Sequence, residues 1–182
     1  MKKRNRALLF PFCPVPAGLL AFRSAAGQEQ ILTIGWVGVV CSSPAIISVS
    51  CRRHAREMSE LPQGNAFSIN LPPEEMLASS GFRKLVQCED IRLLVGSGLY
   101  VENGMATGGP LLAGSQVSIE CSRATVSSRF GEEVVSGEVI AVHLEGEIYG
   151  PEGMPDLSRL KPFNRPSSRP PGAEAAAGRS FT

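Results

Sequence analysis

Short segments in which apolar and polar residues alternate follow one another along much of the chain. Residues 67–71 (FSINL) and 116–120 (QVSIE) alternate with a period of two, and residues 134–144 form the longest strand candidate. Successive side chains of a β-strand point to opposite faces, so this period predicts strands with one buried face. Gly, Pro, Asn and Ser separate the segments, which is typical of an all-β barrel or sandwich.

The sequence from residue 19 to residue 40 predicts a buried hairpin. Residues 19–23 are expected to form a strand, residues 25–28 (AAGQ) a turn, and residues 31–40 a second strand that is apolar on both faces. Residues 45–51 (AIISVSC) predict a third strand. Gly137, inside the longest strand candidate, indicates a bulge or a close backbone approach.

Helical signals are few. Residues 52–61 have helical character, because Met58 and Leu61 can share one face with Ala55. Two prolines at 72 and 73 end the preceding strand, and residues 74–77 (EEML) are expected to begin a helix. After residue 163 the chain is rich in Pro, Ser, Gly and Ala, so we expect one domain at 1–163 and a flexible tail at 164–182.

The N-terminus admits two interpretations. Basic residues followed by the apolar run at 7–22 are similar to a secretory signal with a cleavage site near residues 24–26. Pro11, Pro14 and Pro16 interrupt the run, and proline breaks the helix that such a signal needs. We therefore expect the run to be retained as ordered β structure, and no other stretch approaches the roughly 18 to 20 apolar residues of a membrane-spanning helix.

Composition narrows the function classes. The chain has 182 residues, 43% of them hydrophobic and 19% charged, which suits a single globular domain. Its net charge of +1 gives no overall field that would attract nucleic acid or an anionic membrane. The five cysteines include no CxxC pair and no zinc-ligand spacing, so we expect no metal site and reduced thiols in a cytoplasmic protein.

Five segments together resemble the flavin reductase-like, FMN-binding split barrels, including the flavoredoxin-type members. They are ILTIGWVGVVCSSP at 31–44, NAFSINLP at 65–72, GGPLLAGSQVSIEC at 108–121, SGEVIAVHLE at 136–145 and DLSRLKPF at 156–163. The order and spacing match the family over about residues 8 to 163. The resemblance implies a mainly β fold, a six-stranded Greek-key split β-barrel with a few short helices, assembled as a homodimer.

The resemblance also implies a flavoprotein oxidoreductase. FMN would take electrons from NADH or NADPH, or from another donor, and pass them to a flavin, a ferric complex or another small acceptor. Because the cofactor supplies the redox chemistry, few side chains need to act as acids or bases, and we assign no catalytic residue. The alternative is a diverged split-barrel protein that binds a different ligand or has lost FMN.

Resemblance assigns cofactor contacts to the segment from 33 to 43. Thr33, Gly35 and Trp36 would lie along the flavin, while the turn Cys41-Ser42-Ser43 would offer backbone amides to the ring's carbonyl edge or to the phosphate. The alternatives are structural: Trp36 as a core aromatic residue, Gly35 and Gly38 as relief of crowding in a curved strand, and Cys41 as a small buried hydrophobic residue. We expect His143 and Glu138 to be structural as well.

The phosphate-binding segment departs from the family. Typical members read Ser-x-Arg-Pro-x-Arg-Tyr-Ser, and here Ser50 and Arg52 match whereas Arg53 and Arg56 stand at the proline and the tyrosine. Ser50, Arg52, Arg53 and Arg56 are therefore predicted to hold the phosphate in an altered way, at the start of a helix. The alternative is a solvated basic turn.

Overall fold

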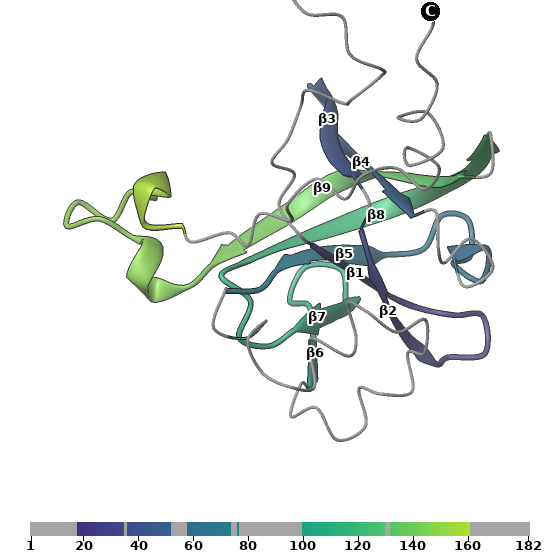
Figure 1. Cartoon of the computed structure of the whole chain (residues 1–182), viewed down its shortest axis with the longest axis horizontal. Coiled ribbons are helices and arrows are strands. Elements are labelled where there is room, and N and C mark those ends of the chain that lie inside the picture. The colour runs from purple at the N-terminus through teal and green to yellow at the C-terminus, as the bar shows by residue number, and fades with distance from the viewer. Residues whose placement is uncertain are drawn as a thin grey trace, which may run out of the picture.

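The computed structural model describes residues 18–34, 36–51, 58–73, 76, 100–129 and 132–160. Within these ranges the secondary structure is almost entirely β (Figure 1). The elements are β1 (Leu19–Arg23), β2 (Glu29–Thr33), β3 (Trp36–Ser42), β4 (Ala45–Cys51), β5 (Phe67–Leu71), β6 (Val101–Asn103), β7 (Pro110–Leu112), β8 (Val117–Arg129), β9 (Glu132–Leu144) and the 3-10 helices η2 (Gly146–Ile148) and η3 (Leu157–Arg159).

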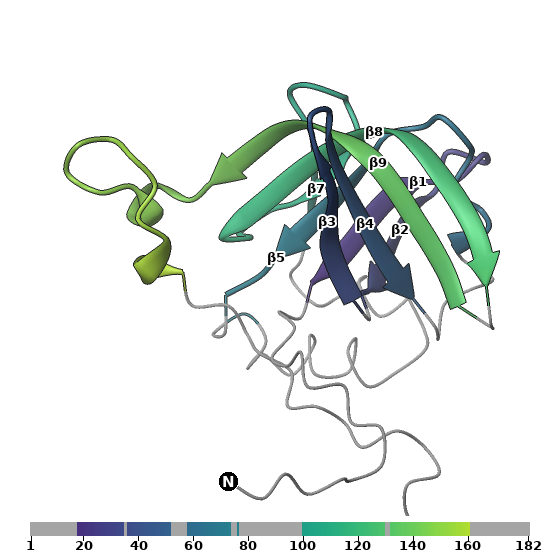
Figure 2. The same ribbon diagram turned by 90° about the horizontal axis from the view of Figure 1, so that it is seen from above.

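Seven strands form one antiparallel sheet in the order β2-β1-β5-β8-β9-β4-β3. Strands β2 and β3 follow each other in the chain yet lie at opposite edges of this sheet. The three residue steps from Thr33 to Trp36 span at most about 11 Å, so the two edges must lie close together. The sheet therefore curls into a barrel with a seam between β2 and β3 (Figure 2), which confirms the split β-barrel class. The strand count differs, because seven strands form the barrel sheet and β6 and β7 pair separately.

The expectation of one strand at residues 31–40, buried on both faces, is wrong. The segment is divided at residues 34 and 35: the Ile34 amide donates to the Gly18 carbonyl at 2.9 Å, which continues the register of β1 and β2, and β3 begins two residues later. β2 then pairs with β1, whereas β3 pairs with β4 at the other sheet edge. Trp36, Val39 and Val40 are exposed on β3, because an edge strand has a neighbour on one side only.

Other strand expectations hold. The strands at 19–23, 45–51 and 67–71 have the expected limits, and the hairpin of β1 and β2 is buried at its centre. β8 continues nine residues past the predicted end at 120, to Arg129. Met58 and Met76 are helical, as expected, but residues 59–61 form a turn instead of continuing the expected helical segment; Met58 and Leu61 are buried together in the core. No helix in the described ranges is long and apolar enough to cross a membrane.

Several expectations fall on residues that the structure does not describe. Residues 19–22 of the N-terminal apolar run form most of β1, but residues 7–17 lie outside the described ranges. The same holds for the tail at 164–182 and for residues 52–57, 74, 75 and 77 of the two expected helical segments.

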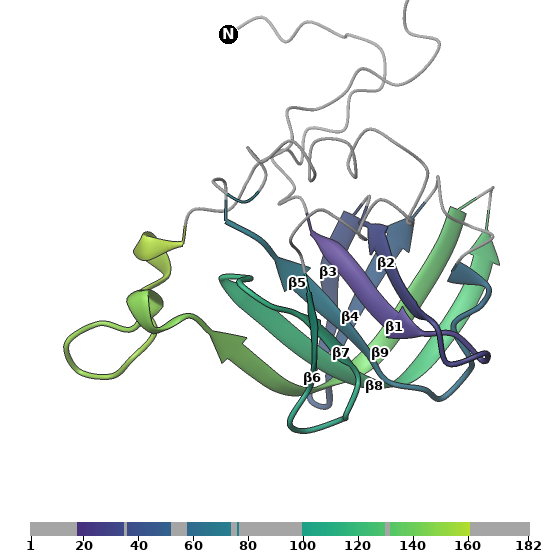
Figure 3. The same cartoon turned by 90° about the horizontal axis from the view of Figure 1, so that it is seen from below.

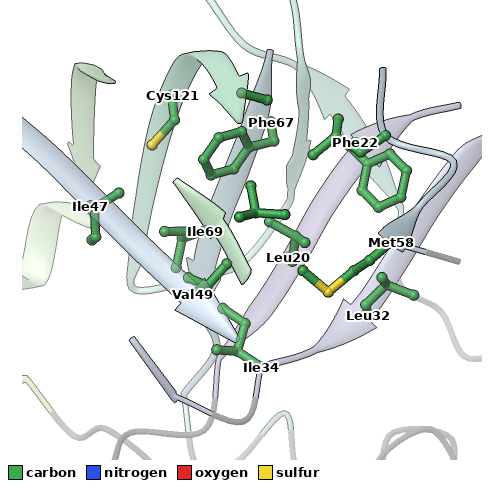
Figure 4. Close-up of a cluster of buried hydrophobic side chains, with 13 residues drawn as sticks. Leu20, Phe22, Leu32, Ile34, Ile47, Val49, Met58, Phe67, Ile69 and Cys121 are labelled. Carbon is green, nitrogen blue, oxygen red and sulfur yellow. The ribbon is translucent and has the colours of Figure 1, made fainter. Parts of the chain in front are cut away.

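The core fills the inside of the curled sheet (Figure 4). Inward-facing side chains from six strands and from the Met58 turn meet there and exclude water. The largest fully buried ones are Phe22 and Phe67. Burial of apolar area at roughly 25 cal/mol per Å² is the main force that holds such a barrel closed. Residues that alternate with these core positions point to the outside of the barrel.

Gly137 lies where the backbone approaches the core closely, as its place within a strand predicted. A Cβ atom there would lie 2.4 Å from Cε1 of Phe67 and 2.9 Å from the Ser122 carbonyl oxygen. The facing strand β8 is irregular between Ser122 and Thr125, and Arg123 has a φ of 54°. Two β8 residues therefore stand opposite Gly137, and this bulge bends both long strands around the barrel.

The β6–β7 hairpin covers part of the outside of the barrel, over β1, β5 and β8 (Figure 3). Arg23, at the end of β1, holds the hairpin from the side. Its Nη1 donates to the Gly108 carbonyl at 2.8 Å, and its Nη2 donates to Oδ1 of Asn103. A second set of hydrogen bonds lies beneath the hairpin and is described with the site.

Residues 145–160 form an arm that leaves the barrel after β9 (Figure 1). Internal bonds hold its shape: a bridge joins Tyr149 to Pro155, and the Asp156 amide donates to the Ile148 carbonyl at 2.8 Å. At the root of the arm, the Glu145 amide donates to the Gln116 carbonyl at 3.0 Å.

Candidate functional site

The candidate cofactor contacts on β3 and β4 face the outside of the barrel. Val49 is fully buried in the core, so its neighbours Ser48 and Ser50 point the other way. In the antiparallel register Trp36 lies opposite Ser50 and Gly38 lies opposite Ser48, and paired residues share a face. Trp36, Gly38, Ser48 and Ser50 therefore share one outward surface.

The indole of Trp36 lies against the backbone of Gly38. A Cβ atom at Gly38 would be 2.4 Å from Cζ2 and 2.5 Å from Cη2 of the indole, so only glycine leaves room for the ring in this position. The side of the ring that faces away from Gly38 is open, since Trp36 is 46% exposed. The structure therefore excludes the interpretation of Trp36 as a core aromatic residue. It agrees with the interpretation that Gly38 relieves crowding in the strand.

Short hydroxyl side chains of β4 and β9 lie on the same outward surface as the indole. Ser48 Oγ and Ser136 Oγ share a hydrogen bond of 2.9 Å between β4 and β9, and Ser48 Oγ also lies 3.3 Å from the Val135 carbonyl. Ser50 is partly buried beside them and pairs with Val134 of β9. The paired outward side chains next to Trp36 are thus short and uncharged, and the Ser48 hydroxyl is buried and already hydrogen-bonded.

Thr33 ends β2 across the seam from Trp36. It pairs with Leu19 and is partly buried. Because only two residues separate Thr33 from Trp36, the structure brings Thr33, Trp36 and Ser50 to one end of the barrel. Gly35, Arg52, Arg53 and Arg56 lie outside the described residues. Arg52 follows Cys51, the last residue of β4, so the chain leaves the barrel at this same end.

The turn that joins β3 to β4 lies at the other end of these strands. Cys41 is five residues from Trp36, which corresponds to about 16 Å along a strand. Ser42 and Ser43 are exposed, and Cys41, which is partly exposed, donates a weak hydrogen bond from Sγ to the Ser43 carbonyl at 3.4 Å. Cys41 does not lie in a fully buried segment as expected, because β3 is an edge strand. The turn and the Trp36 group therefore cannot hold the same small chemical group.

A second polar cluster lies beneath the β6–β7 hairpin, and sequence reasoning did not select its central residue. The Glu120 side chain is 0% exposed. Its carboxylate accepts hydrogen bonds from the Thr107 amide and hydroxyl, both at 2.7 Å, and from the Ala106 amide at 3.2 Å. Nε2 of His143 lies 2.6 Å from Oε1 of the same carboxylate. The only signal in the sequence is a glutamate at a position that, by alternation, should face solvent.

Hydrogen bonds keep Glu120 ionised. Burial acts to raise the pKa of its carboxyl, but the hydrogen bonds from Thr107, His143 and Ala106 outweigh burial and lower this pKa to about 2. A Cβ atom at Gly104 would lie 2.3 Å from Oε2, so the hairpin backbone closes tightly over the carboxylate. A buried, fully paired carboxylate of this kind anchors the hairpin.

The remaining candidates have structural partners. Arg123 forms an ion pair with Glu138 at 3.4 Å, and His143 is 35% exposed beside Glu120, in agreement with the structural roles expected for Glu138 and His143. Burial, and then the negative charge of Glu120, raise the pKa of the Cys121 thiol to about 12, so this cysteine is unreactive. In the described part of the chain no three His, Cys, Asp or Glu side chains are grouped to hold a metal ion.

Solved structures share this fold. Flavoredoxin from Desulfovibrio vulgaris (Miyazaki F) is 20% identical, with 96% of this chain and 100% of that chain covered and a TM-score of 0.70. The 2-nitrobenzoate 2-nitroreductase of Pseudomonas fluorescens is 16% identical, with 85% and 78% covered and a TM-score of 0.69. An FMN-binding protein from Thermus thermophilus with bound 1-cyclohex-2-enone is 18% identical, with 85% and 86% covered and a TM-score of 0.61.

No curated protein sequence matches the chain. The flavin reductase like domain, as a sequence family, matches residues 13–157, which is most of the chain. This match confirms the resemblance drawn from the sequence motifs and supports a flavin-related oxidoreductase. The chain belongs to the flavin reductase-like domain family.

Proposed function

We propose that the protein is an FMN-dependent oxidoreductase that carries electrons from NADH or NADPH to a small acceptor. One observation carries the proposal: an exposed indole and a serine hydroxyl share a flat outward surface at the end of the barrel from which the arginine-rich segment departs. Solved structures with this fold include a flavoredoxin and an FMN-binding protein, which agrees with a flavin as the ligand.

The residues present fit a flavin. Gly38 and the serines leave the surface beside Trp36 without bulky side chains, and hydroxyl groups there can donate to ring oxygens. We propose that Thr33, Gly35 and the edge of Trp36 border one end of the ring, and that the backbone amides of Cys41, Ser42 and Ser43, about 16 Å away along β3, contact its far carbonyl edge. A bound flavin accepts electrons as hydride and releases them to an acceptor, while the protein binds and orients both.

The phosphate of FMN would be held by Ser50, Arg52 and either Arg53 or Arg56. Guanidinium groups form charge-assisted, two-point hydrogen bonds to phosphate, each worth about 1.5 to 3 kcal/mol when shielded from water. Loss of one should weaken FMN binding by roughly 10- to 100-fold. Riboflavin lacks the phosphate and should bind equally to wild type and variant.

The test uses the single tryptophan of the chain as a reporter. FMN and riboflavin are titrated separately into flavin-free wild type and into the Arg52→Gln, Arg53→Gln and Arg56→Gln variants, and quenching of Trp36 emission gives each Kd. We expect tighter binding of FMN than of riboflavin in wild type, with the difference reduced in Arg52→Gln. If no flavin binds to wild type, the protein is a split barrel for another ligand.

The electron donor needs its own experiment. Anaerobic mixing of the FMN-loaded protein with NADH and with NADPH should bleach the flavin absorbance near 450 nm, a general property of flavins, with one of the two faster. Bleaching by neither nucleotide, but by dithionite, would point to a different donor, such as a reduced protein.

We also propose that the protein is a homodimer. Val39 and Val40, near the turn of the edge strand β3, are 76% and 62% exposed, and an edge strand with bare apolar residues is usually covered by a neighbour. Sedimentation at micromolar concentration should give twice the chain mass. Val40→Lys should shift the protein to monomer, and a monomeric wild type would overturn this assembly.

A further inference from the structure

The exposed part of the Trp36 indole is larger than contact of the ring edge with a flavin would require. Cζ2 and Cη2 of the indole lie against the backbone of Gly38, and Trp36 is 46% exposed. The outward side chains paired beside it on β4 and β9, Ser48, Ser50, Val134 and Ser136, are short and uncharged. An indole placed in this way presents exposed, flat, apolar area next to hydroxyl groups.

From this arrangement we infer that the free face of Trp36 stacks the planar aromatic ring of the electron acceptor. The inference rests on the proposed function, and it adds the substrate class: flat, neutral aromatic compounds such as quinones, rather than ferric complexes. A ring stacked on an indole gains dispersion and electrostatic contact over its whole face, whereas an octahedral metal complex has no flat face to offer. The uncharged surface favours a neutral ring, because a charged ligand would lose hydration there without gaining an oppositely charged partner.

Gly38 has a defined part in this arrangement. A methyl group at position 38 would enter the space that the indole occupies, so the ring must swing away from the strand. Gly38→Ala therefore displaces the platform while keeping the tryptophan. Trp36→Ala removes it, and Trp36→Phe keeps a smaller aromatic face. Tyr100→Ala is the matched control, because Tyr100 is an exposed aromatic residue on the other side of the molecule, beside the β6–β7 hairpin.

The first measurement needs no flavin and no turnover. 1,4-Naphthoquinone is titrated into the flavin-free protein while Trp36 emission is recorded, with free N-acetyltryptophanamide as the reference for collisional quenching. We expect saturable quenching of the wild type and of Tyr100→Ala. For Gly38→Ala the Kd should rise roughly 10-fold, which corresponds to about 1.4 kcal/mol. For Trp36→Ala, binding is measured by calorimetry and should fall by at least as much.

The second measurement uses the FMN-loaded protein with excess reduced nicotinamide. Naphthoquinone takes two electrons and two protons to become the hydroquinone, and ferricyanide takes one electron per ion. With FMN at saturating concentration, we expect Trp36→Ala to raise the KM for naphthoquinone roughly 10-fold while the KM for ferricyanide stays within about twofold, with Trp36→Phe between wild type and Trp36→Ala.

The outcomes separate the two proposals. If FMN affinity falls roughly 10-fold in Trp36→Ala and naphthoquinone does not quench saturably, the indole stacks on the flavin itself; the acceptor inference is then wrong and the proposed function stands. If KM rises equally for naphthoquinone and ferricyanide, Trp36 does not select aromatic acceptors. If wild type binds naphthoquinone but no FMN, the stacking surface is real and the proposed flavin function is wrong.

Discussion

Two parts of the same barrel sheet use their outward-facing side chains in opposite ways. Over β1, β5 and β8 the outward residues Asn70 and Glu120 lie beneath the β6–β7 hairpin, where Asn70 accepts from the Leu112 amide at 3.0 Å and from Ser118 Oγ at 2.9 Å. Over β3, β4 and β9 no described element crosses the surface (Figure 2), and Trp36 is 46% exposed. The covered part contains the more polar residues, and the open part contains the tryptophan.

This difference shows how to interpret a polar residue on a sheet face. A buried carboxylate or amide with all its hydrogen bonds made inside the protein has no capacity left for a ligand, and exchanging those bonds would cost stability. An exposed ring, such as that of Trp36, has free apolar area that a ligand can cover. The covered part should therefore govern stability, and the open part should govern binding.

The largest expected effect is at Glu120. Glu120→Ala leaves the Thr107 and Ala106 amides and His143 without their shared acceptor, and breaking a buried ionic cluster costs about 3 to 5 kcal/mol. Urea denaturation should show this loss in the free energy of unfolding. Glu138→Ala is the control: its ion pair with the exposed Arg123 should contribute less than about 1 kcal/mol. Equal losses in both variants would contradict the comparison.

The same carboxylate predicts a pH dependence. Its pKa is about 2 in the folded protein and 4.5 ordinarily, so the folded state prefers the ionised form. This stabilisation is complete above pH 4.5 and is lost as the pH falls from 4.5 toward 2. In Glu120→Gln the Tm should be lower at neutral pH and should fall less steeply over that acid range. Parallel Tm curves for the two proteins would show that Glu120 does not titrate in this way.

A smaller loss is expected at Gly137. Gly137→Ala drives a methyl group into the Phe67 ring and the Ser122 carbonyl, and such overpacking costs about 1 to 3 kcal/mol. Gly146→Ala is a matched control, because a Cβ there would have no neighbour within 4 Å and the change should stay within about 0.5 kcal/mol. Thermal unfolding of the two variants checks both values.

A gain is expected at the bulge. Arg123 has a φ of 54°, a conformation that costs a residue with a Cβ about 1 kcal/mol and costs glycine little. Arg123→Gly and Arg123→Ala both lose the ion pair with Glu138, so the difference between them isolates the backbone cost. Arg123→Gly should be about 1 kcal/mol more stable than Arg123→Ala in urea denaturation. The reverse order would show that the bulge does not hold this conformation in solution.

The smallest effect on stability should come from the open surface. Trp36→Ala removes a ring that is 46% exposed and lies outside the core, so the free energy of unfolding should change by less than about 1 kcal/mol. Ligand affinity should fall in the same variant. A loss of stability as large as that of Glu120→Ala would mean that Trp36 serves the fold rather than a ligand.

Local pattern determined much of the fold. The strands at 19–23, 45–51 and 67–71 were predictable, because alternation and turn residues act over a few neighbouring positions. The end of β8 was not, since the bulge opposite Gly137 interrupts the alternation and the strand continues beyond it. Residues 31–40 were wrongly predicted to form one strand. An apolar run contains no signal for the position at which the chain crosses the seam from one sheet edge to the other.

The sequence likewise predicted some of the polar clusters on the outside of the barrel and not others. Family motifs in the sequence selected Trp36 and Ser50, and the register of β3 and β4 sets them side by side. Glu120 could not be recognised, since a glutamate in an alternating strand has the same pattern whether water or a hairpin lies over it. The sequence by itself determined the class of fold and the face on which each strand residue lies, because both follow from local periodicity. Only the tertiary structure decided which outward residues are covered, because the cover comes from a segment that the local pattern around those residues does not include.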